Sequence, residues 1–265
     1  MSEKENLLDK IVSLCKRRGF VYQSAEIYGG FAGFWDYGPY GLALRNNIKN
    51  SWWKMFVEER EDMHGVDATE ITKHEVLAAS GHVSGFSDPL ADGSRFNTMF
   101  KTSVGAGEES QVAYLRPETA QGIFTNFKNI IDSFHPKLPF GIAQIGKAFR
   151  NEIAPRDFLF RVRELEQMEI EYFVRPEAWM DAFEMWRSTV HRWIAAVGID
   201  AAKVHELEVP ENERAHYSKR TIDFEFDFPF GRKELYGLAY RTDYDLTQHA
   251  NASGVDLSYL DEETK

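Results

Sequence analysis

Charged side chains alternate along the stretch LFRVRELEQMEIEYF, residues 159–173, in a pattern that suits a ligand carrying both signs of charge. In a β-strand, successive side chains point to opposite faces. One face then carries Phe160, Val162, Met168, Ile170 and Tyr172, and the other carries Arg161, Arg163, Leu165, Gln167, Glu169 and Glu171. Guanidinium and carboxylate groups on one face predict binding of a molecule with anionic and cationic groups, although a solvated sheet face gives the same pattern.

A second charged pair, Arg150 and Glu152, shares a face of the preceding strand candidate, just before the hairpin sequence IAPRDFL. Arginine offers a rigid fork to a phosphate, and a carboxylate accepts a hydrogen bond from an amine such as that of adenine. The sequence contains neither a P-loop nor a GxGxxG motif. We therefore predict that a nucleotide would be held by the surface of this sheet.

Helices and antiparallel strands are expected to position these groups. An amphipathic helix is predicted over residues 4–18, and a second helix begins near Pro39 and runs to about Arg60. The other expected elements are strands over 66–71, 112–116, 139–152, 159–174 and 221–228, helices over 117–133 and from Pro176, and a final strand and short helix. Residues 80–110 are expected to be mostly loop. Because long strands meet through tight turns, this order favours an α+β fold, an antiparallel sheet flanked by helices.

Two apolar patterns are expected to build the core. In the helix after Pro176, a stripe at steps of three and four residues consists of Trp179, Phe183, Trp186, Val190 and Trp193. In the strand over 221–228, the alternating apolar residues are Ile222, Phe224, Phe226 and Phe228.

The composition indicates one globular domain over residues 1–265. The chain is 43% hydrophobic, has no stretch of roughly 20 uncharged apolar residues and starts without a signal peptide, so a cytoplasmic location without membrane contact is expected. The single cysteine, Cys15, excludes an internal disulfide and a cysteine cluster, and no zinc is expected. A formal net charge of −11 argues against broad electrostatic binding of nucleic acid, so any RNA contact is expected to be local.

The residues around these charged groups resemble motif 2 of class II aminoacyl-tRNA synthetases, in the form used by the homodimeric glycyl enzymes. The resemblance rests on FRNE, residues 149–152, followed by FRVRELEQMEIEYF, and it extends along the chain. Further matching blocks are YGGFAGFWDYGPYGLALRNNIKNSWW, SGHVSGFSDP, FNTMFKTSVG, YLRPETAQGIFTNFKN and ELYGLAYRTDYDLTQHANASGVDLSYLDEETK. The resemblance implies a glycine–tRNA ligase, which activates glycine with ATP to glycyl-adenylate and transfers glycine to the acceptor end of tRNA(Gly) in protein biosynthesis. It also implies a homodimer formed near residues 40–72.

The resemblance assigns catalytic roles to Arg150, which would clamp the α-phosphate and the glycine carboxylate, and to Glu152, which would bind the adenine amine. The implied ATP-binding positions are Arg150, Asn151, Glu152, Phe160, Arg161, Arg163, Leu165, Glu234 and Leu235. The implied glycine-binding positions are Glu118, Leu165, Gln167, Glu169 and Arg241. ATP and Mg²⁺ are the expected cofactors, with Glu234 as the implied Mg²⁺ ligand. Because glycine has no side chain, its selection depends on a tight pocket that excludes a methyl group.

Structural alternatives stay open for several of these residues. Glu118 fits an acidic residue in the first turn of a helix, where the helix macrodipole favours a negative charge. Glu169 and Arg163 fit a cross-strand ion pair, and Arg241 fits a surface cap. Either a dimer interface or core packing explains three apolar residues of the second helix, Trp52, Trp53 and Phe56.

Four features depart from the family pattern. The chain ends before motif 3, whose arginine holds the γ-phosphate, and before an anticodon-binding domain, so reduced or absent activity is expected of this chain alone. Only LADGSR stands between Pro89 and Phe96, where relatives carry a longer insertion. Leu165 stands where the family usually has a phenylalanine that stacks on adenine, which predicts weaker ATP binding. An alternative interpretation is therefore a truncated or engineered core that folds and binds ATP and glycine weakly without full turnover.

Overall fold

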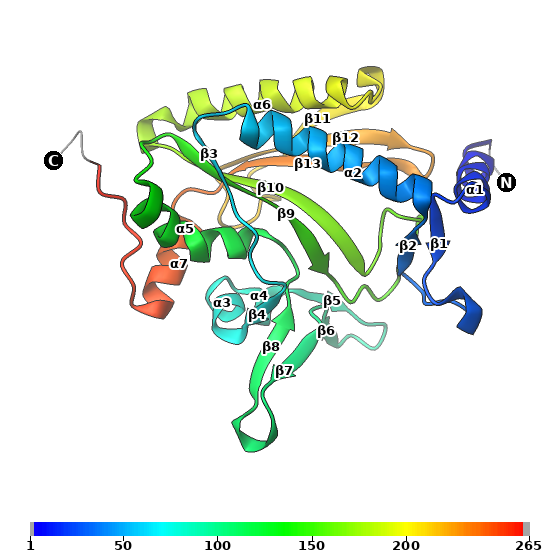
Figure 1. Ribbon diagram of the computed structural model, residues 1–265, viewed down its shortest axis with the longest axis horizontal. Coiled ribbons are helices and arrows are strands. Elements are labelled where there is room, and N and C mark those ends of the chain that lie inside the picture. The colour runs from blue at the N-terminus through cyan, green and yellow to red at the C-terminus, as the bar shows by residue number, and fades with distance from the viewer. Residues whose placement is uncertain (1–2, 262–265) are drawn as a thin grey trace. The chain divides into compact units, whose positions relative to one another are not determined.

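A computed structural model describes residues 3–261 of the chain. The chain forms two compact units, which are described separately. One unit combines the described residues of Met1–Arg18 with Phe173–Tyr244, and the other combines Gly19–Tyr172 with those of Asp245–Lys265. Figure 1 labels the helices and strands of both units. Among the helices within residues 3–261, none combines the length and the apolar content that a bilayer-spanning helix requires.

The first unit is an antiparallel three-stranded sheet with one long helix packed on it. The sheet has the order β11–β12–β13, and Figure 1 shows α6 running along it. The elements of this unit are α1 at Glu3–Arg17, η4 at Pro176–Ala178, α6 at Trp179–Ala196, η5 at Ala201–Lys203, β11 at Val204–Glu208, β12 at Arg220–Phe228 and β13 at Gly231–Tyr240. A register shift between Phe224 and Glu225 marks a β-bulge in the β12–β13 pair. The expected antiparallel strands with a covering helix are therefore present in this unit.

The apolar stripe of α6 and the alternation in β12 form the core of this unit. Phe183 and Ile194 from α6 pack with Ile222 and Phe224 from β12, and all four are buried. The other stripe residues are buried or half-buried, namely Trp179, Trp186, Val190 and Trp193. Burial of such large side chains stabilises the unit by roughly 1.5–3 kcal/mol each. The stripe of α6 is confirmed, and the alternation in β12 is confirmed for Ile222 and Phe224, whereas Phe226 and Phe228 are half-buried and lie outside this cluster.

The second unit is built around a sheet of order β10–β9–β3. These strands are β3 at Met63–Gly65, β9 at Phe140–Phe149 and β10 at Glu164–Phe173. Helix α5, Ala120–Phe134, packs on β9, where the rings of Phe127 and Phe140 stack 6.0 Å apart. The backbone N–H of Arg150 donates to the carbonyl of Arg163 at 2.9 Å, so the end of β9 meets the start of β10 as in a hairpin. The hairpin predicted for motif 2 is present.

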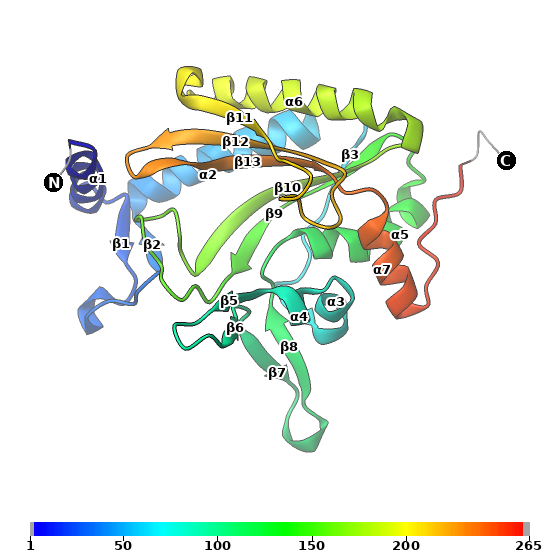
Figure 2. The ribbon, with the colours of Figure 1, turned by 180° about the vertical axis from the view of Figure 1, so that it is seen from behind.

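A smaller sheet of order β4–β8–β7 lies in the same unit. Its strands are β4 at Ile71–Lys73, β7 at Lys101–Val104 and β8 at Gln111–Leu115, and Figure 2 shows the β7–β8 hairpin near α3 and α4. Leu77, Met99 and Tyr114 form its buried core. The remaining elements of the unit are β1 at Val21–Gln23, η1 at Glu26–Tyr28, β2 at Trp35–Tyr37, α2 at Pro39–Trp53, η2 at Lys54–Glu58, α3 at His74–Ala79, α4 at His82–Gly85, β5 at Ser87–Pro89, β6 at Arg95–Asn97, η3 at Gly107–Glu109 and, after the junction of the two units, α7 at Tyr244–Ser253.

Three expectations about local structure are corrected. Residues 66–70 are not a strand; β3 ends at Gly65 and β4 begins at Ile71. The sheet was expected to be antiparallel, but β3 pairs with β9 in parallel. Residues 80–110 contain short strands and helical turns, because elements of three or four residues are too short to show a periodicity.

The shortened stretch after Pro89 closes as a tight hairpin between β5 and β6. The N–H of Leu90 donates to the carbonyl of Ser94 at 2.8 Å, and the Asp92 carboxylate accepts from the Ser94 N–H at 3.0 Å. Gly93 adopts a left-handed φ of 84°, which glycine tolerates without strain. A short loop of this kind is sufficient to connect the two strands.

Candidate active site

Four predicted site residues of the second unit lie at the turn between β8 and α5, namely Glu118, Arg150, Gln167 and Glu169. This turn, Pro117–Glu118–Thr119, comes directly before the first residue of α5, Ala120. Pro117 and Thr119 are buried, and Glu118 is half-buried. The helix was expected to begin at residue 117, but it begins three residues later. Glu118 therefore precedes the helix, and the interpretation of Glu118 as a first-turn acid is wrong.

Arg116 anchors this turn from inside the protein. Its guanidinium donates to the carbonyls of Lys147 and Ala68, both at 2.6 Å. The residue is only 3% exposed, and burial lowers the pKa of its guanidinium, against the opposing effect of Glu70 and Asp67. A buried guanidinium is stable only when its donors find acceptors, and these carbonyls supply them. Arg116 therefore fixes the backbone that carries Glu118 and Thr119.

Two predicted glycine-binding residues of β10 bind Thr119. The Thr119 N–H donates to Oε1 of Gln167 at 3.1 Å, and the Thr119 hydroxyl donates to Oε2 of Glu169. Threonine at a helix N-cap commonly accepts a hydrogen bond from the first turn, but no such cap bond forms here. The hydroxyl holds a carboxylate of the neighbouring strand instead.

Glu118 lies beside these residues and has neutral or titratable partners of its own. Its Oε1 accepts from Nε2 of Gln121 at 2.9 Å and lies 3.4 Å from Nε2 of His82. The Glu118 side chain is 20% exposed, so its charge is partly shielded from water. One turn thus brings together Glu118, Gln167 and Glu169. Two of these side chains are carboxylates, and a site that binds a cation requires such negative charge.

Arg150 links this turn to the hairpin between β9 and β10. Its Nε donates to the carbonyl of Pro117 at 3.0 Å, and its guanidinium carbon lies 5.6 Å from the centre of the Phe86 ring. The cation–π geometry orients a guanidinium without neutralising it. A fixed positive group therefore stands next to the carboxylates of the turn, so the arrangement can bind a zwitterion.

The hairpin residues make a different set of contacts. Oε2 of Glu152 lies 3.3 Å from Nη1 of Arg161. Arg163 donates to the carbonyls of Glu152 and Ala32, at 3.0 and 2.7 Å. The backbone N–H of Asn151 donates to the carbonyl of Thr98 at 2.7 Å. Here Arg163 binds backbone carbonyls and Arg161 binds the half-buried carboxylate of Glu152, while the Arg161 side chain itself is 43% exposed.

The tip of the hairpin is strained. Asp157 and Phe158 are consecutive residues other than glycine with φ values of 59° and 60°. Such left-handed conformations cost of order 1–3 kcal/mol each and persist only when contacts enforce them. The edge of Phe158 packs on Trp35 with ring centres 5.0 Å apart, while Phe160 is 38% exposed. The predicted ATP-wall residue Phe160 is therefore at the surface of the loop.

Both faces of β10 are covered, which corrects the alternative of a solvated sheet face. Each residue of β10, including Leu165, is half-buried. The face expected to be apolar carries Glu166, which binds Arg45 and Lys49 of α2 at 2.7 and 2.8 Å. Burial alone would raise the pKa of Glu166, but the hydrogen bonds from Arg45 and Lys49 lower it below the ordinary value. Ion pairing therefore permits a carboxylate where periodicity alone predicted apolar packing.

Three predicted site residues belong to the first unit. Glu234 is exposed on β13, with neighbouring Glu225 as its strand partner in register, and Leu235 is half-buried. The Arg241 guanidinium carbon lies 3.9 Å from the centre of the Tyr217 ring. Within residues 3–261 there is no group of three or more His, Cys, Asp or Glu side chains that could hold a metal ion. The roles of these three residues stay predictions.

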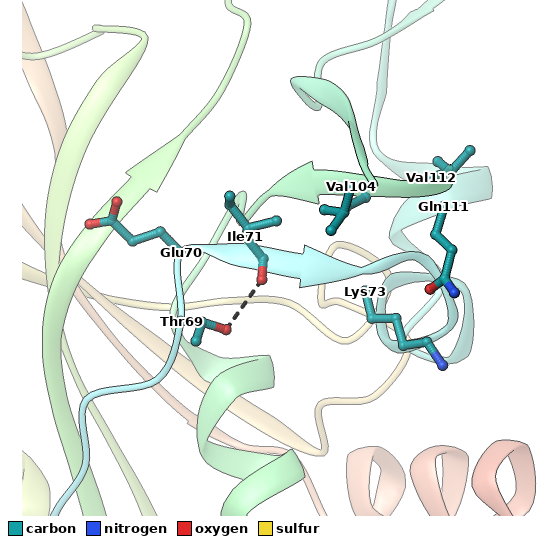
Figure 3. Close-up of a pocket in the computed structure, with 8 residues that line it drawn as sticks. Thr69, Glu70, Ile71, Lys73, Val104, Gln111 and Val112 are labelled. Atoms are coloured by element: carbon teal, nitrogen blue, oxygen red, sulfur yellow. Dashed lines mark hydrogen bonds between the residues drawn. The ribbon is translucent and has the colours of Figure 1, made fainter. Parts of the chain in front are cut away.

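Two surface pockets of the second unit differ in chemistry. The larger, about 640 Å³, follows β4, β7 and β8, and Figure 3 shows the side chains of Ile71, Val104 and Val112 along it. The smaller, about 380 Å³, is lined partly by Glu118 and Gln121. The smaller pocket thus reaches Glu118 and Gln121, whereas Arg150, Gln167 and Glu169 do not line it.

Several residues of the site escaped the sequence analysis. His82, Phe86, Gln121 and His249 all contact predicted residues or their partners. His82 and Phe86 lie in the SGHVSGFSDP block and Gln121 in the RPETAQ block, so the blocks themselves were the available signal. His249 lies 128 residues from its partner, and no local pattern reveals such a contact.

Comparisons with known proteins show the family and the fold of the chain. Residues 100–261 match the family of the tRNA synthetase class II core domain (G, H, P, S and T). The glycine–tRNA ligase of Clostridium tetani is 44% identical, covering 98% of this chain and 69% of that protein. The glycine–tRNA ligase of Thermobifida fusca is 44% identical, covering 100% of this chain and 68% of that protein. The prolyl-tRNA synthetase of Giardia lamblia, solved with prolyl-adenylate, has a similar fold with a TM-score of 0.73 at 18% identity, covering 92% of this chain and 47% of that one.

Proposed function

We propose a function for this chain on one premise: it belongs to the glycine–tRNA ligase family, within the class II tRNA synthetases. The chain acts as the catalytic core that activates glycine with ATP to glycyl-adenylate and transfers glycine to the acceptor end of tRNA(Gly). Its α+β fold is that of the class II core. The cytoplasmic location expected from the sequence stays a prediction.

The observation that carries this proposal is the cluster at the Pro117–Thr119 turn. Arg150, Glu118 and Glu169 all contact this turn or belong to it. The smallest amino acid offers only an ammonium and a carboxylate, and here two carboxylates and one guanidinium stand together. The carboxylates bind the ammonium, and Arg150 binds the glycine carboxylate and the α-phosphate.

The reaction depends on positioning and charge neutralisation. A carboxylate oxygen of glycine attacks the α-phosphorus of ATP in line, and pyrophosphate leaves with the electrons of the broken bond. Arg150 stabilises the negative charge that develops on the phosphoryl oxygens. A terminal ribose hydroxyl of tRNA then attacks the glycyl carbonyl, and AMP leaves. Two carboxylates close to Cα also leave little room for the methyl group of alanine.

In this proposal the hairpin of the second unit holds ATP. Glu152 accepts from the adenine amine, and Arg161 and Arg163 lie on the same hairpin. Mg²⁺ usually binds one or two carboxylates together with substrate phosphates, and an exposed carboxylate such as Glu234 fits that requirement. When bound, the metal neutralises phosphate charge. No zinc is part of the proposal.

Glycine-dependent ATP–pyrophosphate exchange tests the function directly. Any exchange that the protein supports should depend on glycine, and alanine or serine should support far less. The Arg150→Lys variant keeps the charge but loses the planar fork, so its exchange rate should fall by roughly 100-fold or more. Comparable exchange with alanine would overturn the substrate assignment.

The alternative of a weakly binding core without full turnover makes a different prediction. Such a core would bind glycine and ATP in calorimetric titrations but would give no exchange above background. Leu165 in place of a stacking ring is one of the four departures from the family pattern that motivated this alternative. Leu165→Phe is therefore the informative variant, because it should strengthen ATP binding if the missing ring limits the reaction.

A homodimer is part of the proposal. Trp52 and Phe56 are 5% and 3% exposed, so these two residues belong to the core of the second unit. Helix α2 instead presents Tyr40 and Leu44, which lie four residues apart on one face of the helix and are 64% and 51% exposed. An apolar face of this kind supports association of two copies. Light scattering should give the mass of a dimer, and Leu44→Arg should shift it toward the monomer.

A further inference from the structure

Gln121 occupies the centre of a buried polar network in the second unit. The residue lies in the first turn of α5 and is only 3% exposed. Its Nε2 donates to Oε1 of Glu118 at 2.9 Å and to Oδ1 of Asp245 at 3.3 Å. Its Oε1 lies 2.8 Å from Nε2 of His249. The single amide therefore connects the carboxylate before α5 to two residues of α7.

The partners fix the orientation of this amide. Both carboxylates accept hydrogen bonds, so the NH₂ group of Gln121 must face Glu118 and Asp245. The carbonyl oxygen then faces the ring of His249, and the Nε2–H of that ring is the donor. Burial lowers the pKa of His249, against the opposing effect of Asp245, which keeps the ring neutral as this tautomer requires. All the groups of the amide are thus satisfied in one orientation.

The chemistry of the amide suits a carboxylate that must attract a cation. A lysine or arginine at position 121 would hold Glu118 but would also neutralise its charge. An amide donates a hydrogen bond and carries no net charge, so it fixes the carboxylate and leaves its attraction for an ammonium intact. Because Asp245 and His249 are 4% and 5% exposed, the support behind the amide is rigid as well.

We propose that Gln121 is a positioning residue that holds the Glu118 carboxylate in its ammonium-binding orientation and ties it to helix α7. This inference rests on the proposed function, in which Glu118 binds the ammonium of glycine. It adds that the affinity for glycine depends on α7, through Gln121, although neither Gln121 nor α7 binds the substrate. His249 acts on Glu118 only through the amide.

Calorimetric titration of glycine, in the presence of a non-hydrolysable ATP analogue, tests the inference. Gln121→Met keeps the length of the side chain and removes its hydrogen bonds. We expect the Kd for glycine to rise roughly 10-fold, because a hydrogen bond to a charged group is worth at least that factor. The Kd for the ATP analogue should stay within about 2-fold of the wild-type value. Gln121→Glu should weaken glycine binding at least as much, because a third carboxylate faces Glu118 and Asp245.

A matched control and a second site keep the inference testable if Gln121→Met folds poorly. Asn129→Met places the same side chain on the exposed face of α5 and should leave both affinities unchanged. His249→Phe removes the donor to the amide and should raise the Kd for glycine by a smaller factor, roughly 3-fold. The double variant of Gln121→Met and His249→Phe should match Gln121→Met alone, because both changes act through one amide.

The outcomes separate this inference from the proposed function. If the wild-type protein does not bind glycine, the proposed function fails and this inference fails with it. If the wild type binds glycine and the folded Gln121 and His249 variants bind it equally well, the inference alone is overturned. Equal losses of glycine and ATP affinity would also overturn it, because they would indicate general disruption of the fold.

Discussion

The buried turn, residues 117–121, and the hairpin, residues 150–163, hold their charged groups in different ways. In the buried turn, neutral donors are among the partners of the carboxylates: Gln121 binds Glu118, which also lies 3.4 Å from His82, and Thr119 binds Glu169. In the hairpin, a charged group faces a charged group, as Glu152 and Arg161 do at 3.3 Å. A neutral donor leaves the charge of a carboxylate available, whereas an ion pair partly cancels it. The turn is thus arranged before the substrate binds, and the hairpin must exchange partners to bind one.

Burial reinforces this difference. Thr119 and Gln121 are 0% and 3% exposed, while the Arg161 side chain is 43% exposed. Electrostatic interactions are stronger where water is excluded, and exposed pairs are screened by salt. The hairpin also carries backbone strain at Asp157 and Phe158, which a bound nucleotide can offset with new contacts. We infer that selectivity for the amino acid arises in the turn and that nucleotide binding depends on the adaptable hairpin.

Removal of the Thr119 hydroxyl should give the largest effect among the variants that compare the turn with the hairpin. Thr119→Val keeps the shape of the side chain and leaves Glu169 without this donor. We expect the Kd for glycine to rise roughly 10-fold, since the orientation of a charged hydrogen-bond partner is lost. Calorimetric titration of glycine measures this change. Thr119→Ser keeps the hydroxyl and should remain within about 2-fold of the wild type, and an equal loss in both variants would contradict the role of the hydroxyl.

The sequence predicted part of one face of β10, because the two-residue period applies from Glu164 onward, whereas Arg161 and Arg163 lie before the strand. The two-residue period placed Gln167 and Glu169 together, and both reach Thr119. The opposite face was predicted to be apolar, but Glu166 is stabilised there by α2, whose residue Arg45 lies 121 positions away. Local pattern describes how a strand alternates, and it contains no information on which distant element covers each face.

The same limit applies to the rest of the candidate site. Contacts of Gln121 with Asp245 and His249 join residues separated by 124 and 128 positions. The start of α5 was misplaced because Pro117 is favourable in a first helical turn, yet here it belongs to a turn that Arg116 anchors through buried carbonyls. The family resemblance supplied the site residues, and only tertiary contacts identified the neutral residues that orient them.

The pH dependence of stability tests how firmly the buried turn is supported. Burial lowers the pKa of His249 below its ordinary value of 6.5, so the folded protein favours the neutral ring. As pH falls, His249 takes up a proton in the unfolded chain before it does so in the folded protein. The contribution of the neutral His249 ring to the free energy of unfolding is therefore present above pH 6.5 and is lost between that value and the lower folded pKa. Each unit of depression corresponds to about 1.4 kcal/mol.

Replacing His249 removes this titration. His249→Gln should be less stable than the wild type at pH 7.5, and the difference should shrink as pH falls to roughly 5, because only the wild type loses the contribution of a neutral buried ring. Urea unfolding at a series of pH values measures both curves. Parallel curves over this range would show that His249 is not held neutral by its surroundings.

The hairpin ion pair should give the smallest effect on stability. Arg161→Ala removes the partner of Glu152 at a site where the arginine side chain is 43% exposed. Exposed ion pairs contribute about 0–1 kcal/mol, so the free energy of unfolding should change by no more than about 0.5 kcal/mol in urea titrations at moderate salt. The Kd for the ATP analogue is the more sensitive measurement, because Arg161 is a predicted ATP-binding residue and should lose affinity without loss of stability. A destabilisation above about 2 kcal/mol would mean that the hairpin is as firmly held as the buried turn, and the contrast between the two regions would no longer hold.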